Sequence, residues 1–134
     1  MALYIAAMPE TDAASLSLAR SGKVLVVEDV ALIRLAAMDM IEQLGFAGVE
    51  AADGEEALAL VRSDPGIGIL FTDLGLPGMN GRQLVEEARR LKPDIKIIIA
   101  SGYSTGAGSP PEDKDIVRLT KPYDMNQLRK ALSA

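Results

Sequence analysis

The stretch IGILFTD, residues 67–73, combines an apolar run of strand length with an acidic residue at its carboxyl end. Two further runs, 24–27 and 95–100, are nearly continuous in apolar character. Such continuity is typical of parallel strands that are covered on both faces. Residues 49–52 and 116–119 are weaker candidates, expected nearer the edges of the sheet. The chain is therefore predicted to contain five short strands.

Helical patterns separate these runs, and three of them have readable start signals. Asp53, Asn80 and Asp124 each precede a Glu or Gln by three residues, which is the spacing of a capping box. A further helical pattern spans residues 31–44. Its expected core face comprises Ile33, Ala37, Met40, Ile41 and Leu44. Alternating strands and helices with short connections predict a parallel (βα)₅ arrangement with right-handed crossovers.

The segment 101–115 departs from this alternation. The fourth helix should lie here, but glycines and prolines crowd the segment, namely Gly102, Gly106, Gly108, Pro110 and Pro111. Glycine and proline are the least favourable residues in a helix interior. We therefore expect the fourth helix to be short or irregular.

Composition excludes several kinds of chemistry. The 134 residues, 49% hydrophobic, suit a single domain, and the chain contains neither cysteine nor histidine. Disulfides, thiolate metal sites and a histidine base are therefore excluded, and any histidine chemistry must come from a partner. The net charge of −5, with scattered basic residues, disfavours nucleic acid. No apolar run approaches a membrane span and residues 1–22 lack a secretory signal, so a cytoplasmic protein without membrane contact is expected.

Polar residues follow the predicted strands at their carboxyl ends, where parallel α/β sheets place their chemistry. These residues are Glu28 and Asp29 after the first run, Asp73 at the end of the third, Ser101 at the end of the fourth and Lys121 after the fifth. Three converging carboxylates repel one another, and Mg²⁺ removes this conflict because it prefers carboxylate, water and phosphate oxygens. An ammonium group and a hydroxyl suit the oxygens of a phosphoryl group. The set indicates a phosphoryl-transfer site with a carboxylate nucleophile.

Four motifs occur in order along the chain: VLVVED at 24–29, FTDLGLPGMNG at 71–81, ASGY at 100–103 and KPY at 121–123. Together they resemble the receiver domains of two-component response regulators. The resemblance runs from about Lys23 to Leu132. It implies a flavodoxin-like doubly wound sandwich whose five parallel strands lie in the order 2-1-3-4-5. It also divides the chain into an N-terminal tail or linker, 1–22, and a receiver domain, 23–134.

The resemblance implies that Asp73 accepts a phosphoryl group from the histidine of a kinase or histidine phosphotransfer protein. Mg²⁺ is the implied cofactor. Asp29 would bind it directly and Glu28 mainly through water, and the backbone carbonyl of Gly75 would complete the protein ligands together with Asp73. Catalysis would be limited to the domain's own phosphorylation and slow hydrolysis, unless the chain is part of a hybrid kinase.

Other implied roles concern the response to phosphorylation. Lys121 would pair with the phosphoryl group, and Ser101 would move toward it. The position three residues before this lysine is usually aromatic in the family, but here it is Arg118. A long cation cannot replace a ring that moves between buried and exposed packing. We therefore expect Tyr103 or Arg118 to rearrange instead, and output to pass through protein contacts.

Residues 3–12 resemble the last strand of a histidine-kinase ATP-binding domain followed by a linker. The chain is therefore predicted to be the C-terminal receiver of a hybrid sensor histidine kinase, and a stand-alone regulator is the alternative. A haloacid-dehalogenase-like phosphatase would need a second aspartate where Gly75 stands. A flavodoxin-like electron carrier would need a Ser/Thr-rich loop in place of Glu28 and Asp29, and a receiver that only binds partners would not need the complete set of site residues.

Overall fold

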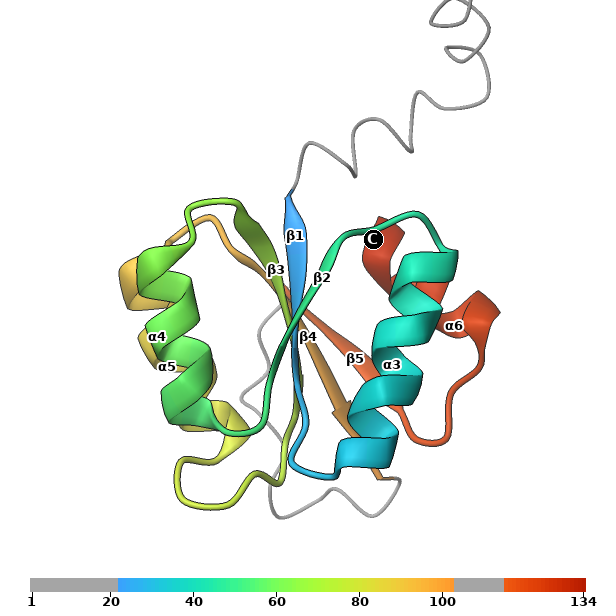
Figure 1. The fold of residues 1–134 in the computed structure, drawn as a ribbon, viewed down its shortest axis with the longest axis horizontal. Coiled ribbons are helices and arrows are strands. Elements are labelled where there is room, and N and C mark those ends of the chain that lie inside the picture. The colour runs from blue at the N-terminus through green and yellow to red at the C-terminus, as the bar shows by residue number, and fades with distance from the viewer. Residues whose placement is uncertain (1–21, 103–114) are drawn as a thin grey trace, which may run out of the picture.

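The computed structural model describes residues 22–102 and 115–134. These ranges contain five strands and four helices (Figure 1). The elements are β1 Lys23–Val27, α3 Ala31–Gln43, β2 Gly48–Ala51, α4 Gly54–Ser63, β3 Ile67–Asp73, α5 Gly81–Leu91, β4 Lys96–Ser101, β5 Ile116–Thr120 and α6 Met125–Ser133. The five predicted strands are all present within a residue or two of their expected bounds.

The five strands form one parallel sheet in the order β2-β1-β3-β4-β5, which confirms the predicted fold. Val27 pairs with Thr72, Asp73 with Ala100, and Ser101 with Thr120. The carboxyl ends of neighbouring strands are therefore level with one another. Because all the strands run the same way, the residues that follow them meet at a single edge of the sheet.

Helices cover both faces of the sheet (Figure 1): α4 and α5 lie on one side, and α3 and α6 on the other. Successive side chains of a strand point to opposite faces, so each inner strand supplies both layers of the core. In β4, Ile97 and Ile99 join the cluster beneath α4 and α5, while Ile98 joins the cluster beneath α3 and α6. All three are at most 1% exposed. Burial on both faces explains why these runs are almost uninterrupted in apolar character.

The helix starts follow the predicted caps with one difference. Asn80 with Gln83, and Asp124 with Gln127, form complete capping boxes at α5 and α6. At α4 the Asp53 side chain accepts a hydrogen bond from the Glu56 N–H at 2.8 Å. The Glu56 carboxylate accepts from the N–H of the residue before Asp53 rather than from Asp53 itself. At the start of α4, Asp53 therefore caps the helix, while Glu56 binds the backbone of the residue that directly follows β2.

Helix α3 is less regular in its packing than the sequence predicts. Ala37 and Ile41 are buried as expected, but Ile33 is 44% exposed although its spacing places it on the core face. Ile33 lies in the first turn, where it lines a small pocket with Asp73 and Lys121 at the carboxyl edge of the sheet. The core face of α3 therefore begins at Ala37, one turn later than predicted.

Two expectations from the sequence fall outside the described residues. The short or irregular fourth helix was expected in 101–115, and 103–114 are not described. The strand-like segment expected within 3–12 belongs to 1–21, which are also not described. Among the helices that are described, none is long and apolar enough to cross a membrane.

Candidate metal and phosphoryl-transfer site

Three carboxylates meet at the carboxyl edge of β1 and β3. Glu28 and Asp29 directly follow β1, and Asp73 is the last residue of the neighbouring strand β3. Each contributes one carboxylate oxygen to a group in which these oxygens all lie within 4.8 Å of one another. Glu28 is only 5% exposed, Asp73 is half-buried and Asp29 is exposed. The pairing of β1 with β3 thus places the residues predicted from the sequence in one cluster.

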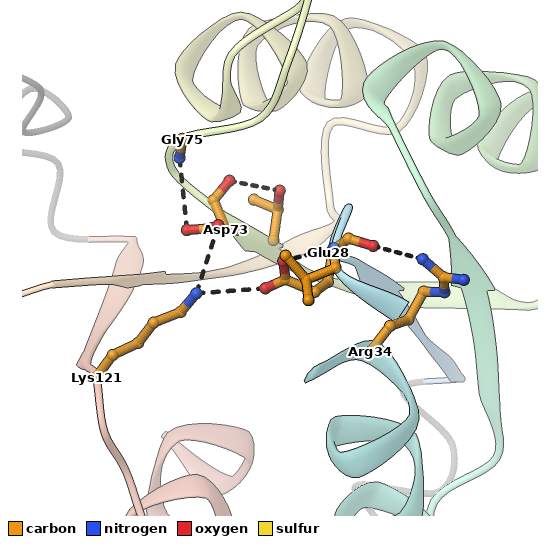
Figure 2. A network of polar contacts seen from close by, with 7 residues as sticks. Glu28, Arg34, Asp73, Gly75 and Lys121 are labelled. Carbon is orange, nitrogen blue, oxygen red and sulfur yellow. Dashed lines mark hydrogen bonds and ion pairs between the residues drawn. The ribbon is translucent and has the colours of Figure 1, made fainter. Parts of the chain in front are cut away.

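Lys121 lies between two of these carboxylates (Figure 2). Its Nζ is 3.3 Å from Glu28 Oε1 and 3.4 Å from Asp73 Oδ2. The backbone holds the lysine in place, because its N–H donates to the Ser101 carbonyl at 2.7 Å. One ammonium contacts two of the three carboxylates, so the cluster keeps an excess of negative charge that a divalent cation would offset.

The side chain, the N–H and the carbonyl of Glu28 all form hydrogen bonds. Its side-chain Oε2 accepts from the Val30 N–H at 3.1 Å, and its own N–H donates to the Ala51 carbonyl at 3.1 Å. Its carbonyl oxygen accepts from Nη1 of Arg34 at 2.8 Å. The sequence did not single out Arg34, which also pairs with Glu50 through Nε at 2.9 Å. No pattern in the sequence marks this arginine, because its partners on β2 and at the Glu28 carbonyl are brought beside it only by the fold.

The loop after Asp73 is anchored to the end of β3. Thr72 Oγ1 donates to the Asp73 carbonyl at 2.9 Å, and the Gly75 N–H lies 3.4 Å from Asp73 Oδ1 (Figure 2). Gly81 starts α5 directly against this strand end, where an added Cβ would lie 2.6 Å from the Asp73 carbonyl oxygen. Only glycine permits so close an approach. The role of the Gly75 carbonyl as a metal ligand stays a prediction.

The three residues predicted to respond to phosphorylation are placed differently. Ser101 ends β4, half-buried, one position past the residue that pairs with Asp73. Arg118 is an exposed residue of β5, opposite Ile99 of β4. Tyr103 lies outside the described residues. The expected movement of Ser101 and the rearrangement of Tyr103 or Arg118 therefore stay predictions.

Tyr123, in the third position of the KPY motif, was given no role from the sequence. Its ring packs edge-on against Phe71, with the ring centroids 5.8 Å apart. It also lines the small pocket that contains Glu28 and Asp73. Burial, and then the negative charges of Glu28 and Asp73, raise the pKa of Tyr123 to about 12. The phenol therefore stays neutral beside the carboxylates.

This raised pKa predicts how stability changes at high pH. The unfolded chain loses the Tyr123 proton near pH 10, whereas the folded protein keeps it until about pH 12. The free energy of unfolding should therefore fall as the pH rises through this range. Titration by phenolate absorbance should show one group near 12 that Tyr123→Phe removes, and the variant should show a weaker pH dependence of unfolding. In denaturant every phenol should titrate near 10, so a native protein that behaves the same way would contradict the prediction.

A doubly wound parallel sheet with carboxylates and an ammonium at its carboxyl edge defines an α/β protein suited to metal-assisted phosphoryl chemistry. Residues 24–133 match the family model described as response regulator receiver domain, and the chain belongs to this family. Receiver domains bind Mg²⁺ at an acidic pocket and take phosphoryl groups from histidine kinases or phosphotransfer proteins.

Curated relatives include both large kinases and small regulators. The chain is 36% identical over 114 residues to the sensor kinase CckA of Brucella abortus (strain 2308), covering 83% of this chain and 12% of that protein. It is 28% identical over 108 residues to the response regulator receiver protein CpdR of the same organism, covering 79% of this chain and 89% of CpdR. The chain thus spans only a small part of the kinase but nearly all of the regulator.

Solved structures agree with the fold. The receiver domain of the hybrid histidine kinase CckA superposes with a TM-score of 0.69 at 28% identity, covering 81% of this chain and 94% of that one. The chemotaxis protein CheY4 of Vibrio cholerae superposes with a TM-score of 0.70 at 26% identity, covering 83% of this chain and 95% of that one.

Proposed function

We propose that Asp73 is the phosphoacceptor of this receiver, and that the domain acts as a Mg²⁺-dependent phosphorylation switch in a phosphorelay. The observation that carries this proposal is the cluster of three carboxylates within 4.8 Å, with the Lys121 ammonium 3.4 Å from Asp73 Oδ2. An Asp73 oxygen forms a bond to phosphorus while the bond from phosphorus to the donor's histidine nitrogen breaks, and the electron pair returns to the imidazole. The product is an aspartyl phosphate.

The donor set fits Mg²⁺. Glu28, Asp29 and Asp73 offer carboxylate oxygens, which are the hard ligands that Mg²⁺ prefers, and the chain contains no cysteine or histidine to favour a softer metal. When bound, the cation supplies positive charge against the carboxylates and the transferred phosphoryl oxygens. Glu28 is already oriented by its own loop, so little reorganisation is needed to form the site.

Lys121 and Ser101 act on the phosphoryl group. Lys121 exchanges its contact with Asp73 Oδ2 for a phosphoryl oxygen, and its link to Glu28 keeps the ammonium near the site meanwhile. Ser101, at the end of the adjacent strand, donates its hydroxyl to a second phosphoryl oxygen. Its movement then carries the signal to the surface around β5, where Arg118 lies.

The direct test is phosphorylation by a small donor. The protein is incubated with acetyl phosphate and Mg²⁺ and its intact mass is measured. A gain of one phosphate is expected, and chelation of Mg²⁺ should prevent it. Absence of the gain in the wild-type protein with Mg²⁺ present would contradict phosphoacceptance and would favour a receiver that only binds partners.

The receiver is also proposed to be the C-terminal part of a hybrid sensor histidine kinase, with residues 1–22 as a tail or linker before the receiver at 23–134. The higher identity to the sensor kinase CckA, 36% against 28% for CpdR, supports this origin over a stand-alone regulator. The upstream reading frame tests it. An in-frame kinase ATP-binding domain before Leu3 is expected, and an in-frame stop codon directly upstream would support the stand-alone alternative.

The phosphohistidine partner is proposed to dock on the first turns of α3. Leu32 is 79% exposed, Leu35 56% and Val30 46%, and the neighbouring Ile33 lines the pocket that contains Asp73. A donor must bring its histidine to Asp73, so it must cover the surface beside that pocket. Exposed leucines of this kind are suited to an apolar partner helix.

Leu32→Glu should therefore slow phosphorylation by a protein donor but not phosphorylation by acetyl phosphate. Phosphotransfer from a phosphorylated histidine phosphotransfer protein that serves the wild type should slow by about 10-fold or more. Phosphorylation by acetyl phosphate should not change, because Asp73 and Lys121 are untouched. Leu91→Glu is the matched control, since Leu91 is 38% exposed at the end of α5, near the opposite edge of the sheet. Equal slowing with both donors, or no slowing with either, would contradict the docking surface.

A further inference from the structure

We propose that Arg34 is a positioning residue for the metal site. It fixes the peptide bond that joins Glu28 to Asp29, and so sets the direction in which the exposed Asp29 carboxylate points. The inference rests on the proposed Mg²⁺-dependent function. It concerns a residue that lies one helical turn away from the acidic pair and contributes no metal ligand.

The Arg34 side chain makes two contacts from one rigid group. Nη1 donates to the Glu28 carbonyl oxygen at 2.8 Å (Figure 2). Nε donates to Glu50 Oε1 at 2.9 Å. The guanidinium is planar, so its N–H bonds point in fixed directions. Glu50 on β2 fixes the direction of the Nε–H bond, and this also fixes the direction in which Nη1 donates to the Glu28 carbonyl. The Arg34 side chain is only 18% exposed, which limits its alternatives.

The carbonyl that Arg34 holds belongs to the peptide unit that continues into Asp29. A peptide unit is planar, so fixing its oxygen also fixes the Asp29 nitrogen and the direction to the Asp29 Cα. The other groups of Glu28 already have partners: its N–H donates to Ala51, and its carboxylate accepts from Val30 and Lys121. Arg34 is the partner of the remaining polar group of Glu28, its carbonyl, and this carbonyl belongs to the peptide unit that leads into Asp29.

A purely stabilising role would have a different signature. The Glu50 side chain is 45% exposed, and ion pairs of such exposure contribute little to stability. If Arg34 only stabilised the fold, its loss would lower the unfolding midpoint and leave the Mg²⁺ affinity of the folded molecules unchanged. A positioning role lowers that affinity directly, as partners of metal ligands commonly do.

The test compares Arg34→Met with Arg62→Met. Arg62 is an exposed residue of α4, and its replacement makes the same change in net charge. Isothermal titration calorimetry with Mg²⁺ alone should show about 10-fold weaker binding for Arg34→Met and less than a twofold change for Arg62→Met. In the Mg²⁺-free protein, the backbone amide resonance of Asp29 should shift in Arg34→Met and stay in place in the control.

Glu50→Gln tests the same link from the other side. It keeps an oxygen that can accept from Nε but removes the charge, so the loss of Mg²⁺ affinity should be smaller, about 2- to 3-fold. This variant also carries the test if Arg34→Met does not fold. If folded Arg34→Met binds Mg²⁺ with wild-type affinity, the positioning role of Arg34 is overturned but the proposed function is not. The same holds for Glu50→Gln if that is the variant measured. A wild-type protein that binds no Mg²⁺ would overturn the proposed function as well.

Discussion

Asp73→Asn is expected to abolish the Mg²⁺-dependent phosphorylation of this receiver by acetyl phosphate and, at the same time, to make the Mg²⁺-free protein more stable. An amide oxygen is a poor nucleophile, so the rate should fall by ~1000-fold or more. The stability should rise because the change removes a charge that repels Glu28 and Asp29, whose carboxylate oxygens lie within 4.8 Å. One attraction, to Lys121 at 3.4 Å, is lost in exchange.

The gain in unfolding free energy should be roughly 1 kcal/mol, since two repulsions are exchanged for one attraction near the surface of the protein. It should shrink as Mg²⁺ is added, because the cation compensates the same charges in the wild type. Intact-mass analysis and thermal unfolding measure the two effects. Asp94→Asn is the control, because Asp94 is exposed between α5 and β4 and away from the cluster. Wild-type phosphorylation of Asp73→Asn would refute the assigned acceptor.

Lys121→Met should damage both stability and reactivity. Without the ammonium, Glu28 is left as a charge that is only 5% exposed, and Asp73 loses the cation that lies 3.4 Å from its Oδ2. Removing one member of a fully buried pair costs roughly 3–5 kcal/mol. Because the Lys121 side chain is 27% exposed, we expect a loss of about 2 kcal/mol in the absence of Mg²⁺. Phosphorylation should slow by about 100-fold or more because the transferred oxygens lose a charged donor.

Mg²⁺ should restore part of the lost stability in Lys121→Met but little of the lost rate. The cation would compensate the charges of Glu28 and Asp73, but it would not supply the hydrogen-bond donor that Lys121 offers to the phosphoryl oxygens. Urea unfolding with and without Mg²⁺, and the time course of the mass gain, measure these two quantities. Lys130→Met on the exposed side of α6 is the control and should behave as the wild type does. Normal phosphorylation kinetics in Lys121→Met would contradict its role.

The sheet could be predicted from the sequence because strands that are buried on both faces are recognisable as short, almost continuous apolar runs. A strand such as β4 must be apolar at successive positions, whichever way each side chain points. The carboxyl-edge residues could be predicted for a related reason, since parallel strands of similar length bring their ends to one edge. The spacing of Asp73 after its apolar run is enough to place it there.

Ile33 and Arg34 could not be predicted because their environments depend on neighbours that are distant in sequence. Helical periodicity assigns Ile33 to a face, but it does not say where along α3 the sheet stops covering that face. Arg34 reads as an ordinary helix-surface cation until Glu50 and the Glu28 carbonyl are brought beside it by the pairing of β1 with β2. Contacts to a backbone carbonyl leave no pattern in the sequence.

Helix α3 carries two features on neighbouring residues. Leu32 and Leu35 are exposed, and Arg34 donates a hydrogen bond to the peptide unit between Glu28 and Asp29. A partner that binds the leucines and shifts the helix also shifts that peptide. Binding of partner and cation is then thermodynamically linked, and the linkage is reciprocal. By whatever factor Mg²⁺ changes the partner's affinity, the partner changes the affinity for Mg²⁺ by the same factor. The first turns of α3 would thus make the cell's free Mg²⁺ concentration one of the variables that set how long donor and receiver stay together.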